Sequence, residues 1–340
     1  MAQRAQQIAS HLNYPSGLLA GQVAITPLCQ RVLDSQSSPE RSIIPVFAPA
    51  APPLLPHDPC GLPMLTTNAK ITGSGQGIGA ECARLFANEG AKVVVCDVDA
   101  AKGEAVAKSI NDASPGNKRA ISVPGDVTDP NYFPVLVSKA AEFGNGKIHI
   151  IVNNAGYTWD GVIHKITDKQ WDTIINVHNT APFRLVRQCA PYFRVKDGEK
   201  RVIINISSTS GTHGNAGQAN YSLAKAGVTG LTKTIAKEWG PQFGVRANTI
   251  AFGHIDTRLT RAKEIGAFIT TADGQRVALG IPGKQIADRK GDDPNAAYRD
   301  IPLGRPGTAT EAASSILAVC SPLFSYVNGQ TIEVTGGRNM

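Results

Sequence analysis

The sequence has no cysteine pattern that would bind zinc or form a disulfide framework. Its six cysteines are scattered over 340 residues without a CxxC pair or a Cys/His cluster. The histidines near the candidate site described below, His164, His213 and His254, also have no spacing typical of metal ligands. We therefore expect no bound metal and mostly buried, reduced thiols, as in proteins of a reducing compartment.

Long hydrophobic runs and runs of basic residues are also lacking. No apolar stretch reaches the roughly 18 residues that a membrane span requires. The formal charge is +7, but no run of five lysines and arginines occurs, and this mild bias favours anionic cofactors and acyl-carrier substrates over nucleic acid. We expect a cytoplasmic protein that binds neither nucleic acid nor a membrane.

Aromatic residues are scarce, at 6%, whereas glycine is plentiful, with 34 residues. This balance is typical of a parallel α/β protein, whose strands are runs of Val, Ile and Ala. Strands are expected at 91–97, 119–126, 147–156, 201–208, 244–253 and 329–337, and helices at segments that include 78–89, 101–112, 169–194, 222–239 and 308–320. Right-handed crossovers turn that order into a Rossmann-type, doubly wound parallel sheet in a single domain.

A glycine turn lies near the start of this alternating region. The stretch "TGSGQGIG" at 72–79 has the pattern TGxxxGxG rather than GxGxxG. A glycine turn that opens a helix lets backbone N–H groups and the positive helix end approach a pyrophosphate, although a flexible loop is the simpler alternative. Asp97 follows Gly79 by 18 residues, where a carboxylate accepts hydrogen bonds from the adenosine ribose, unless it only forms a turn. Gln76 has no Arg or Lys beside it in the turn to pair with a 2′-phosphate, which favours NAD(H).

A second motif, "YSLAK", places Tyr221 and Lys225 four residues apart, on one face of an expected helix. A lysine cation beside a phenol lowers the pKa of the phenol toward working pH, as a general acid or base requires. The same spacing occurs by chance as a surface pair in many helices. Ser208, however, ends an expected strand 13 residues earlier, at the edge where open α/β sheets bind ligands.

Taken together, these motifs resemble the short-chain dehydrogenase/reductase family. TGxxxGIG at 72–79, Asp97, "GDV" at 125–127, "NNAG" at 153–156, Asn176, the Ser208, Tyr221 and Lys225 set, and "GHIDT" at 253–257 occur in the family's order and spacing. The resemblance covers about residues 69–340, which we expect to be the catalytic domain. Within the family, "GNAGQANYSLAKAGV" and "NGQTIEVTGG" are most similar to 3-oxoacyl-acyl-carrier-protein reductases.

The resemblance implies an NAD(P)(H)-dependent enzyme that interconverts a carbonyl and a secondary alcohol. It assigns the proton donor to Tyr221, orientation of the substrate carbonyl to Ser208, the nicotinamide ribose and tuning of Tyr221 to Lys225, and a relay water to Asn176. The implied cofactor-binding residues are Gly73, Ser74, Gln76, Gly77, Ile78, Gly79, Asp97, Asp126, Val127, Asn153, Ala155, Gly156, Tyr221, Lys225, Gly253, Ile255 and Thr257. NAD(H) is favoured, and NADP(H) is the alternative. The helices 169–194 and 222–239 resemble the pair through which the family dimerises, which implies a homotetramer or homodimer.

Three features depart from the family pattern. Phe252 and Gly253 replace the usual "PG", and the segment between Thr257 and Pro302, expected to form a lid over the substrate, is long. Basic residues that dock an acidic carrier protein in acyl-carrier reductases have a counterpart in Lys200 and Arg201, but a second docking position holds Gln242 and Phe243. The substrate is therefore expected to be an acyl thioester or another small molecule, and a polyol, steroid or xenobiotic carbonyl is the alternative.

The first strand is interrupted. In the family an apolar run leads directly into TG, and joining "GQVAI" at 21–25 to "ITGSGQGIG" at 71–79 produces that form. The intervening residues 26–70 include nine prolines and show no periodicity. We interpret them as an insertion, such as translated intron sequence or an alternative exon would produce, within a disordered extension at 1–68; a mitochondrial targeting extension is the alternative. "NAKIT" must then serve as the central strand, with Asn68 and Lys70 where buried apolar residues are expected. A catalytically impaired isoform that binds other subunits becomes a competing function.

Overall fold

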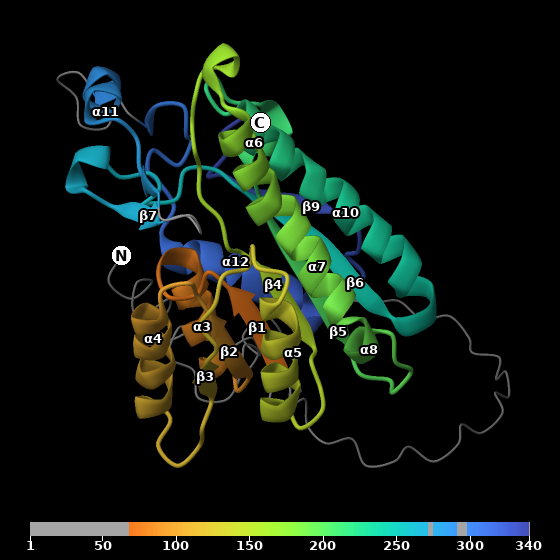
Figure 1. The fold of residues 1–340 in the computed structure, drawn as a ribbon. Coiled ribbons are helices and arrows are strands. Elements are labelled where there is room, and N and C mark those ends of the chain that lie inside the picture. Colours follow the sequence, from red (N-terminus) through yellow and green to blue (C-terminus); the bar gives the residue numbers. More distant parts are fainter. Residues whose placement is uncertain (1–67, 271–274, 291–297, 340) are drawn as a thin grey trace, which may run out of the picture. The chain divides into compact units, whose positions relative to one another are not determined.

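Seven parallel strands form one sheet in the computed structural model, which describes residues 68–270, 275–290 and 298–339. The order across the sheet is β3-β2-β1-β4-β5-β6-β9 (Figure 1). The strands are β1 (Asn68–Thr72), β2 (Lys92–Cys96), β3 (Ala120–Ser122), β4 (Ile150–Asn153), β5 (Arg201–Ser208), β6 (Val245–Phe252) and β9 (Thr331–Val334). Because the chain runs outward from β1 in one direction and from β4 in the other, the sheet is doubly wound, which confirms the predicted fold class.

Strand β1 lies at the centre of the sheet, paired with β2 on one side and β4 on the other. All five of its residues are buried, so "NAKIT" does serve as the central strand. Asn68 is not left unpaired, however, because its side-chain amide donates to the carbonyls of Gly144, at 2.9 Å, and Lys147, at 3.2 Å. The expected mismatch between sequence and core is therefore confined to Lys70.

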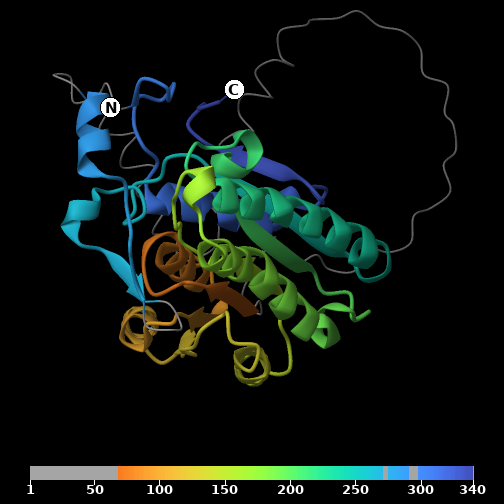
Figure 2. The same cartoon turned by 45° about the horizontal axis from the view of Figure 1, so that its top comes forward.

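Helices cover both faces of the sheet (Figures 1 and 2). Helices α5 (Tyr132–Phe143), α7 (Ala181–Gln188), α8 (Ala190–Phe193) and α10 (Ala219–Phe243) enclose one apolar layer with strand residues such as Val94, Ile151 and Ile203. Helix α3 (Gly77–Asn88) packs against α4 (Ala100–Asp112) and α12 (Ala309–Cys320) over the other face. Helix α5 is an element that the sequence analysis did not name.

The segment expected to be one helix over 169–194 is divided into α6 (Asp168–Ile175), a π-helical turn η4 (Asn176–Thr180), α7 and α8. A π-turn inserts one extra residue per turn and is frequent at functional sites. Here it begins at Asn176, one of the predicted site residues.

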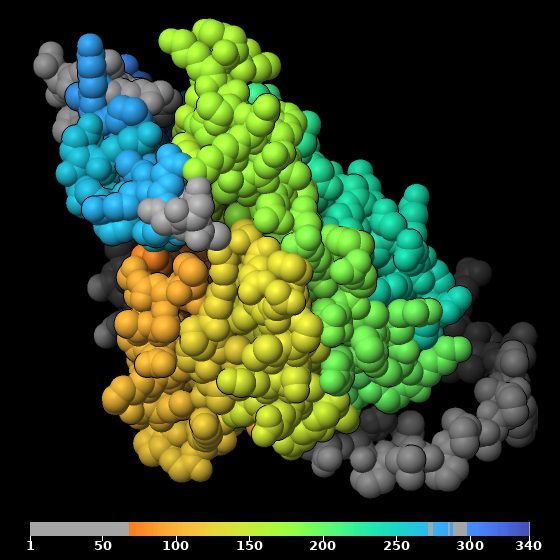
Figure 3. Space-filling view, in the orientation of Figure 1, coloured from red at the N-terminus to blue at the C-terminus, as the bar shows by residue number. Residues whose placement is uncertain are grey.

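The segment after Thr257 contains a two-stranded antiparallel hairpin, β7 (Phe268–Thr270) with β8 (Arg276–Ala278), followed by helix α11 (Gly283–Lys290). In the space-filling view these residues, in cyan and blue, lie beside the yellow-green residues of α6 (Figure 3). The remaining short elements are α9 (Thr209–His213) and the 3₁₀ turns η3 (Ile163–Lys165), η5 (Lys263–Ile265) and η7 (Pro322–Phe324).

Three further expectations concern the whole chain. In the described part, no helix is long and apolar enough to cross a membrane. Cys82, Cys96, Cys189 and Cys320 are buried and form no disulfide, as expected of them. The proposed extension at 1–68 and insertion at 26–70 fall almost wholly on residues 1–67, outside the described residues, so the predicted domain boundaries stay predictions.

Candidate active site

The glycine turn connects β1 to the first turn of α3. Gly73 and Gly77 have φ angles of +61° and +58°, which favour glycine, and a Cβ on Gly79 would lie 2.2 Å from the carbonyl oxygen of Gly73. The side-chain amide of Asn154 donates to the carbonyls of Thr72, at 2.9 Å, and Gly73, at 3.1 Å, and so fixes the turn. Gln76 caps α3 without a side-chain hydrogen bond to the helix, so its first N–H groups are available to an anion.

A cavity of about 690 Å³ lies over this turn, at the carboxyl ends of the strands. The predicted residues that line it are Gly73, Gln76, Gly77, Ile78, Gly79, Asp97, Asp126, Val127, Ala155, Gly156, Asn176 and Thr257. Asp97 accepts backbone hydrogen bonds from Gly75, at 2.9 Å, and Asp99, at 3.0 Å, so its carboxylate is held beside the turn. Open α/β sheets bind ligands at such a crevice.

Two predicted cofactor residues, Ser74 and Asn153, are buried and do not line this cavity. The hydroxyl of Ser74 donates to the carbonyl of Ile71 at 2.6 Å and accepts from the backbone N–H of Cys96 at 2.9 Å. The side chain of Asn153 donates to that of Asn205 at 2.8 Å. Both therefore support the strands that carry the turn.

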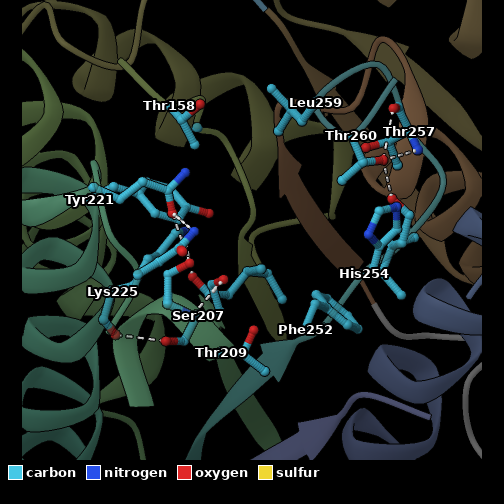
Figure 4. Close-up of a pocket in the computed structure, with 18 of the residues that line it drawn as sticks. Thr158, Ser207, Thr209, Tyr221, Lys225, Phe252, His254, Thr257, Leu259 and Thr260 are labelled. Carbon is cyan, nitrogen blue, oxygen red and sulfur yellow. Dashed lines mark hydrogen bonds between the residues drawn. The ribbon is translucent and has the colours of Figure 1, made fainter. Parts of the chain in front are cut away.

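A second cavity of about 560 Å³ contains Ser208, Tyr221 and Lys225, together with Gly253 and Ile255. It shares Ile78, Asn154, Gly156, Thr257 and Leu259 with the first cavity, so the two cavities adjoin. In Figure 4, Tyr221 and Lys225 project from α10 on one side of this cavity, while Thr257, Leu259 and Thr260 lie on the other. The structure thus brings together the side chains of Ser208, Tyr221 and Lys225, which are separated by up to 17 residues in sequence.

The protonation of this group is controlled by burial. The Nζ of Lys225 donates to the carbonyl of Ile206 at 2.7 Å and lies 5.6 Å from the ring centroid of Tyr221. Burial lowers the pKa of Lys225 to about 7. Burial also raises the pKa of Tyr221 to about 12, although a hydrogen bond with Ser208 opposes the change. The pKa of Tyr221 is therefore raised rather than lowered as expected, because burial disfavours the charged phenolate.

Two residues that the sequence analysis missed adjoin this site. Asn154 fixes the glycine turn, as described above. His178 is buried under Tyr221, with the two rings edge to face and their centroids 5.2 Å apart. Its Nε2 lies 2.8 Å from the carbonyl oxygen of Tyr157 and must carry the proton there, while no described residue hydrogen-bonds to its buried Nδ1. Burial and the Lys225 cation hold the pKa of His178 well below its ordinary value, so the ring is neutral.

A third missed residue, Arg258, lies beside Gln76. With the Gln76 amide turned so that its oxygen faces the guanidinium, that oxygen accepts from Nη1 of Arg258 at 2.5 Å and from Nη2 at 3.2 Å. No short-range motif predicts this contact, because 182 residues separate the two positions. A cation that is absent from the turn in sequence is therefore supplied to it by a distant loop.

Lys200 and Arg201, the two basic residues considered for carrier docking, differ in their surroundings. Arg201 is buried, with 2% exposure, and its guanidinium donates to both carboxylate oxygens of Asp197, at 2.7 and 2.6 Å, and to the carbonyl of Tyr192. It is not available to a partner, so the suggestion that Arg201 docks a carrier is wrong. Lys200 is exposed. Among the described residues, no group of three or more His, Cys, Asp or Glu side chains is arranged to hold a metal.

Comparisons with known proteins agree with this geometry. The model of the short chain dehydrogenase family matches residues 67–266. The 3-oxoacyl-[acyl-carrier-protein] reductase of Vibrio cholerae is 35% identical over 273 residues, which cover 80% of this chain and 97% of the relative. That of Thermotoga maritima is 34% identical over 268 residues, 78% of this chain and 95% of the relative. An uncharacterized oxidoreductase of Mycobacterium bovis is 35% identical over 270 residues, covering 79% and 96%.

Among solved structures, a short chain dehydrogenase from Bacillus anthracis matches 82% of this chain and 98% of its own, with a TM-score of 0.65 and 27% identity. The family model and the relatives cover the segment that holds the glycine turn, Ser208, Tyr221 and Lys225. The chain belongs to the short chain dehydrogenase family and is an oxidoreductase of that family.

Proposed function

We propose that this protein is an NAD(P)(H)-dependent oxidoreductase that interconverts a carbonyl and a secondary alcohol. The observation that carries the proposal is a pair of adjoining cavities lined by different functional groups. A glycine turn and an uncapped helix N-terminus lie at one cavity, and Ser208, Tyr221 and Lys225 line the other. A cofactor bound across both cavities would have its phosphates at the turn and its reactive ring beside the phenol.

The residues around the turn fit a dinucleotide. Added side chains at Gly73 or Gly79 would collide with Ala155 or with the turn itself, so only glycine lets the chain turn this tightly between β1 and α3. The first N–H groups of α3 would hold a diphosphate, and Asp97 would accept hydrogen bonds from the adenosine ribose. When bound, the dihydronicotinamide supplies a hydride. NAD(H) is the favoured form because Asp97 would repel a 2′-phosphate.

The chain itself supplies the proton and the orientation of the substrate. Tyr221, protonated at neutral pH because its pKa is about 12, would donate its phenolic proton to the substrate oxygen. Ser208, which shares a hydrogen bond with that phenol, would hold the same oxygen. Lys225, with a pKa of about 7, can pass a proton on to Tyr221 at neutral pH. Asn176, at the π-turn and facing the cofactor cavity, would hold a relay water.

We propose a 3-oxoacyl thioester as the substrate class. The named relatives that support this choice reduce a 3-oxoacyl group on a carrier protein, according to their names. Burial of Arg201 and the exposed position of a single basic residue there, Lys200, favour a free or coenzyme-bound thioester over a carrier protein. Polyol, steroid and xenobiotic carbonyls remain the alternative substrates.

We propose that two copies of the chain associate through α7 and α10. Both helices expose large apolar side chains, Phe183 at 45% and Leu223 at 50%, and exposed groups of this kind favour association. Sedimentation of the purified chain tests this proposal, since a monomer at micromolar concentration would contradict it.

A panel assay tests the proposed reaction and its substrate. Purified chain is mixed with NADH or NADPH and, in turn, with a 3-oxoacyl-coenzyme A, the matching acyl-carrier-protein thioester, a polyol-derived ketone, a steroid ketone and a quinone. The proposal expects the highest kcat/KM with the coenzyme A thioester. Turnover of another carbonyl alone would select the alternative substrate class, and cofactor binding without turnover of any would favour the impaired isoform.

A further inference from the structure

Arg258 lines the predicted cofactor cavity together with Gln76 and Asp97. It follows Thr257 at the start of the long segment after β6. Its side chain is half-buried there, and its two Nη atoms donate to the Gln76 amide oxygen at 2.5 and 3.2 Å when that amide has the orientation described above. Gln76 is the residue before the first turn of α3, so the guanidinium lies at the mouth of the predicted phosphate site.

The charge of Arg258 is not cancelled by a direct ion pair. Within the described part of the chain, no carboxylate oxygen lies within 4.0 Å of its guanidinium, although Asp97 and Asp99 are near enough to oppose the effect of burial on its pKa. Asp99 is itself paired with Lys102 at 2.6 Å. An arginine held by a neutral amide in a partly buried cavity keeps its full charge and has donors that an anion can use.

Arg261, three residues further on, lines the same cavity but has a different partner. Its guanidinium donates to both carboxylate oxygens of Asp256, at 2.9 and 3.2 Å, and its side chain is 59% exposed. Two arginines in one loop therefore differ in whether a carboxylate neutralises them. The unneutralised one is beside the turn.

We propose that Arg258 is a specificity-determining residue that binds the 2′-phosphate of NADP(H). This inference rests on the proposed dinucleotide site and deepens it. Asp97 repels a 2′-phosphate, and Arg258 offsets that repulsion with a charge-assisted, two-pronged contact that only the phosphorylated cofactor uses. The chain thereby accepts NADP(H) alongside NAD(H), although its glycine turn contains no basic residue.

Equilibrium binding of NADH and NADPH to the full-length chain tests this assignment, with cofactor fluorescence as the readout. We expect R258M to weaken NADPH binding by at least about tenfold, the scale of a lost hydrogen bond to a charged group, and to change NADH binding by less than about threefold. R258K should retain part of the NADPH affinity because it keeps the charge. R261M is the matched control and should leave the ratio of the two affinities unchanged.

Adenosine phosphates, which lack the nicotinamide half of the cofactor, isolate the contact with the 2′-phosphate. Adenosine 2′,5′-bisphosphate should displace NADH from the parent chain at much lower concentration than from R258M, whereas adenosine 5′-monophosphate should displace NADH equally well from both proteins. Parental NADPH affinity in R258M, or an equal loss for NADH and NADPH, would overturn the inference while leaving the dinucleotide site in place. If the parent chain binds neither dinucleotide, the proposed function fails, and the inference fails with it.

Discussion

At the scale of single residues, Lys70 has the least favourable surroundings in the sheet. Its side chain is 1% exposed, and the hydrogen-bond partner that the described residues provide is the sulfur of Cys189, at 3.7 Å. A buried amine with such a weak acceptor costs stability, on the order of 1 to 3 kcal/mol in mutational data. We therefore predict that K70M, which keeps the length of the side chain and removes the amine, raises the free energy of unfolding by about that amount, measured by urea denaturation.

The control for this substitution is K92M. Lys92 is on the neighbouring strand, is only partly buried, and donates to the carbonyl of Phe143 at 3.0 Å. Replacement of Lys92 should not raise the free energy of unfolding. If K70M is less stable than the parent chain, the contact with Cys189 is a net stabilising one and this account of Lys70 is wrong.

His178 should make the stability of the protein depend on pH. Its folded-state pKa is well below the ordinary value of about 6.5, so below pH 6.5 the unfolded chain takes up a proton that the folded chain does not. Stability contributed by the neutral ring is therefore complete above about pH 6.5 and is lost as the pH falls, by up to about 1.4 kcal/mol per pH unit. We predict that urea denaturation at pH 7.5 and 5.5 shows a larger loss in the parent than in H178Q, by about 1 kcal/mol. Equal losses would show that His178 is not held neutral.

Asp97 should favour NADH over NADPH, which is the opposite of the effect proposed for Arg258. Its carboxylate is fixed by two backbone N–H groups and faces the cavity. A like-charge penalty of about one to a few kcal/mol against the 2′-phosphate follows. We predict that the parent chain has a higher kcat/KM with NADH than with NADPH. D97S should bring the ratio of the two kcat/KM values closer to one. Equal use of both cofactors by the parent and by D97S would mean that Asp97 does not contact the ribose.

Local sequence was enough to predict residues whose role depends on near neighbours. The glycine turn, the Tyr221 and Lys225 pair and the buried position of Lys70 all follow from patterns within a few residues. Arg258 beside Gln76 and His178 under Tyr221 could not be predicted in this way, because a loop and a π-turn place them there. The direction of the pKa shift of Tyr221 could not be predicted from the spacing to Lys225 either, since it depends mainly on burial.

At the scale of elements, strand β1 is the test of the interrupted-strand hypothesis. Deleting residues 26–70 joins Ile25 to Ile71 and puts Val23, Ala24 and Ile25 in place of Asn68, Ala69 and Lys70. A buried aliphatic side chain contributes roughly 1.5 to 3 kcal/mol and replaces the buried amine, although the hydrogen bonds from Asn68 to Gly144 and Lys147 are lost. We predict a higher melting temperature and tighter NADH binding, measured by thermal scans with and without NADH.

The deletion also has a clear contrary result. If the shorter chain is no more stable and binds NADH no more tightly, residues 26–70 are an integral part of the fold. K70M then separates the effect of the buried amine from that of the inserted segment, because it removes the amine without altering the chain length. A gain in stability in K70M but not in the deletion variant would mean that the Lys70 side chain alone lowers the stability.

Elements beyond the β/α alternation were harder to predict from sequence. The periodicity of 169–194 is continuous across the π-turn, so a single helix was expected, although the chain is divided there. The hairpin β7–β8 consists of three-residue strands, too short to give an alternating pattern. By contrast, the long buried strands β5 and β6 are rich in apolar residues and were predicted at nearly their observed bounds.

At the scale of the whole molecule, the proposed function divides two roles between two parts of the fold. The sheet and the glycine turn would hold the cofactor, and Tyr221 on α10 would donate the proton. A substitution that removes only the proton donor should then lower turnover without changing the affinity for the cofactor. The neutral ring of His178 packs on the tyrosine ring rather than on its hydroxyl edge alone, so Y221F should keep its packing.

The most direct measurement is the turnover of Y221F against its affinity for NADH. We predict that kcat falls at least about a hundredfold, the typical contribution of a general acid, because the phenolic proton is lost. The dissociation constant for NADH, from fluorescence titration, should change by less than about threefold, a difference of under 1 kcal/mol. A variant that keeps most of its turnover, or one that loses NADH binding to the same degree as turnover, would contradict the central claim that Tyr221 is the proton donor of a carbonyl-reducing site.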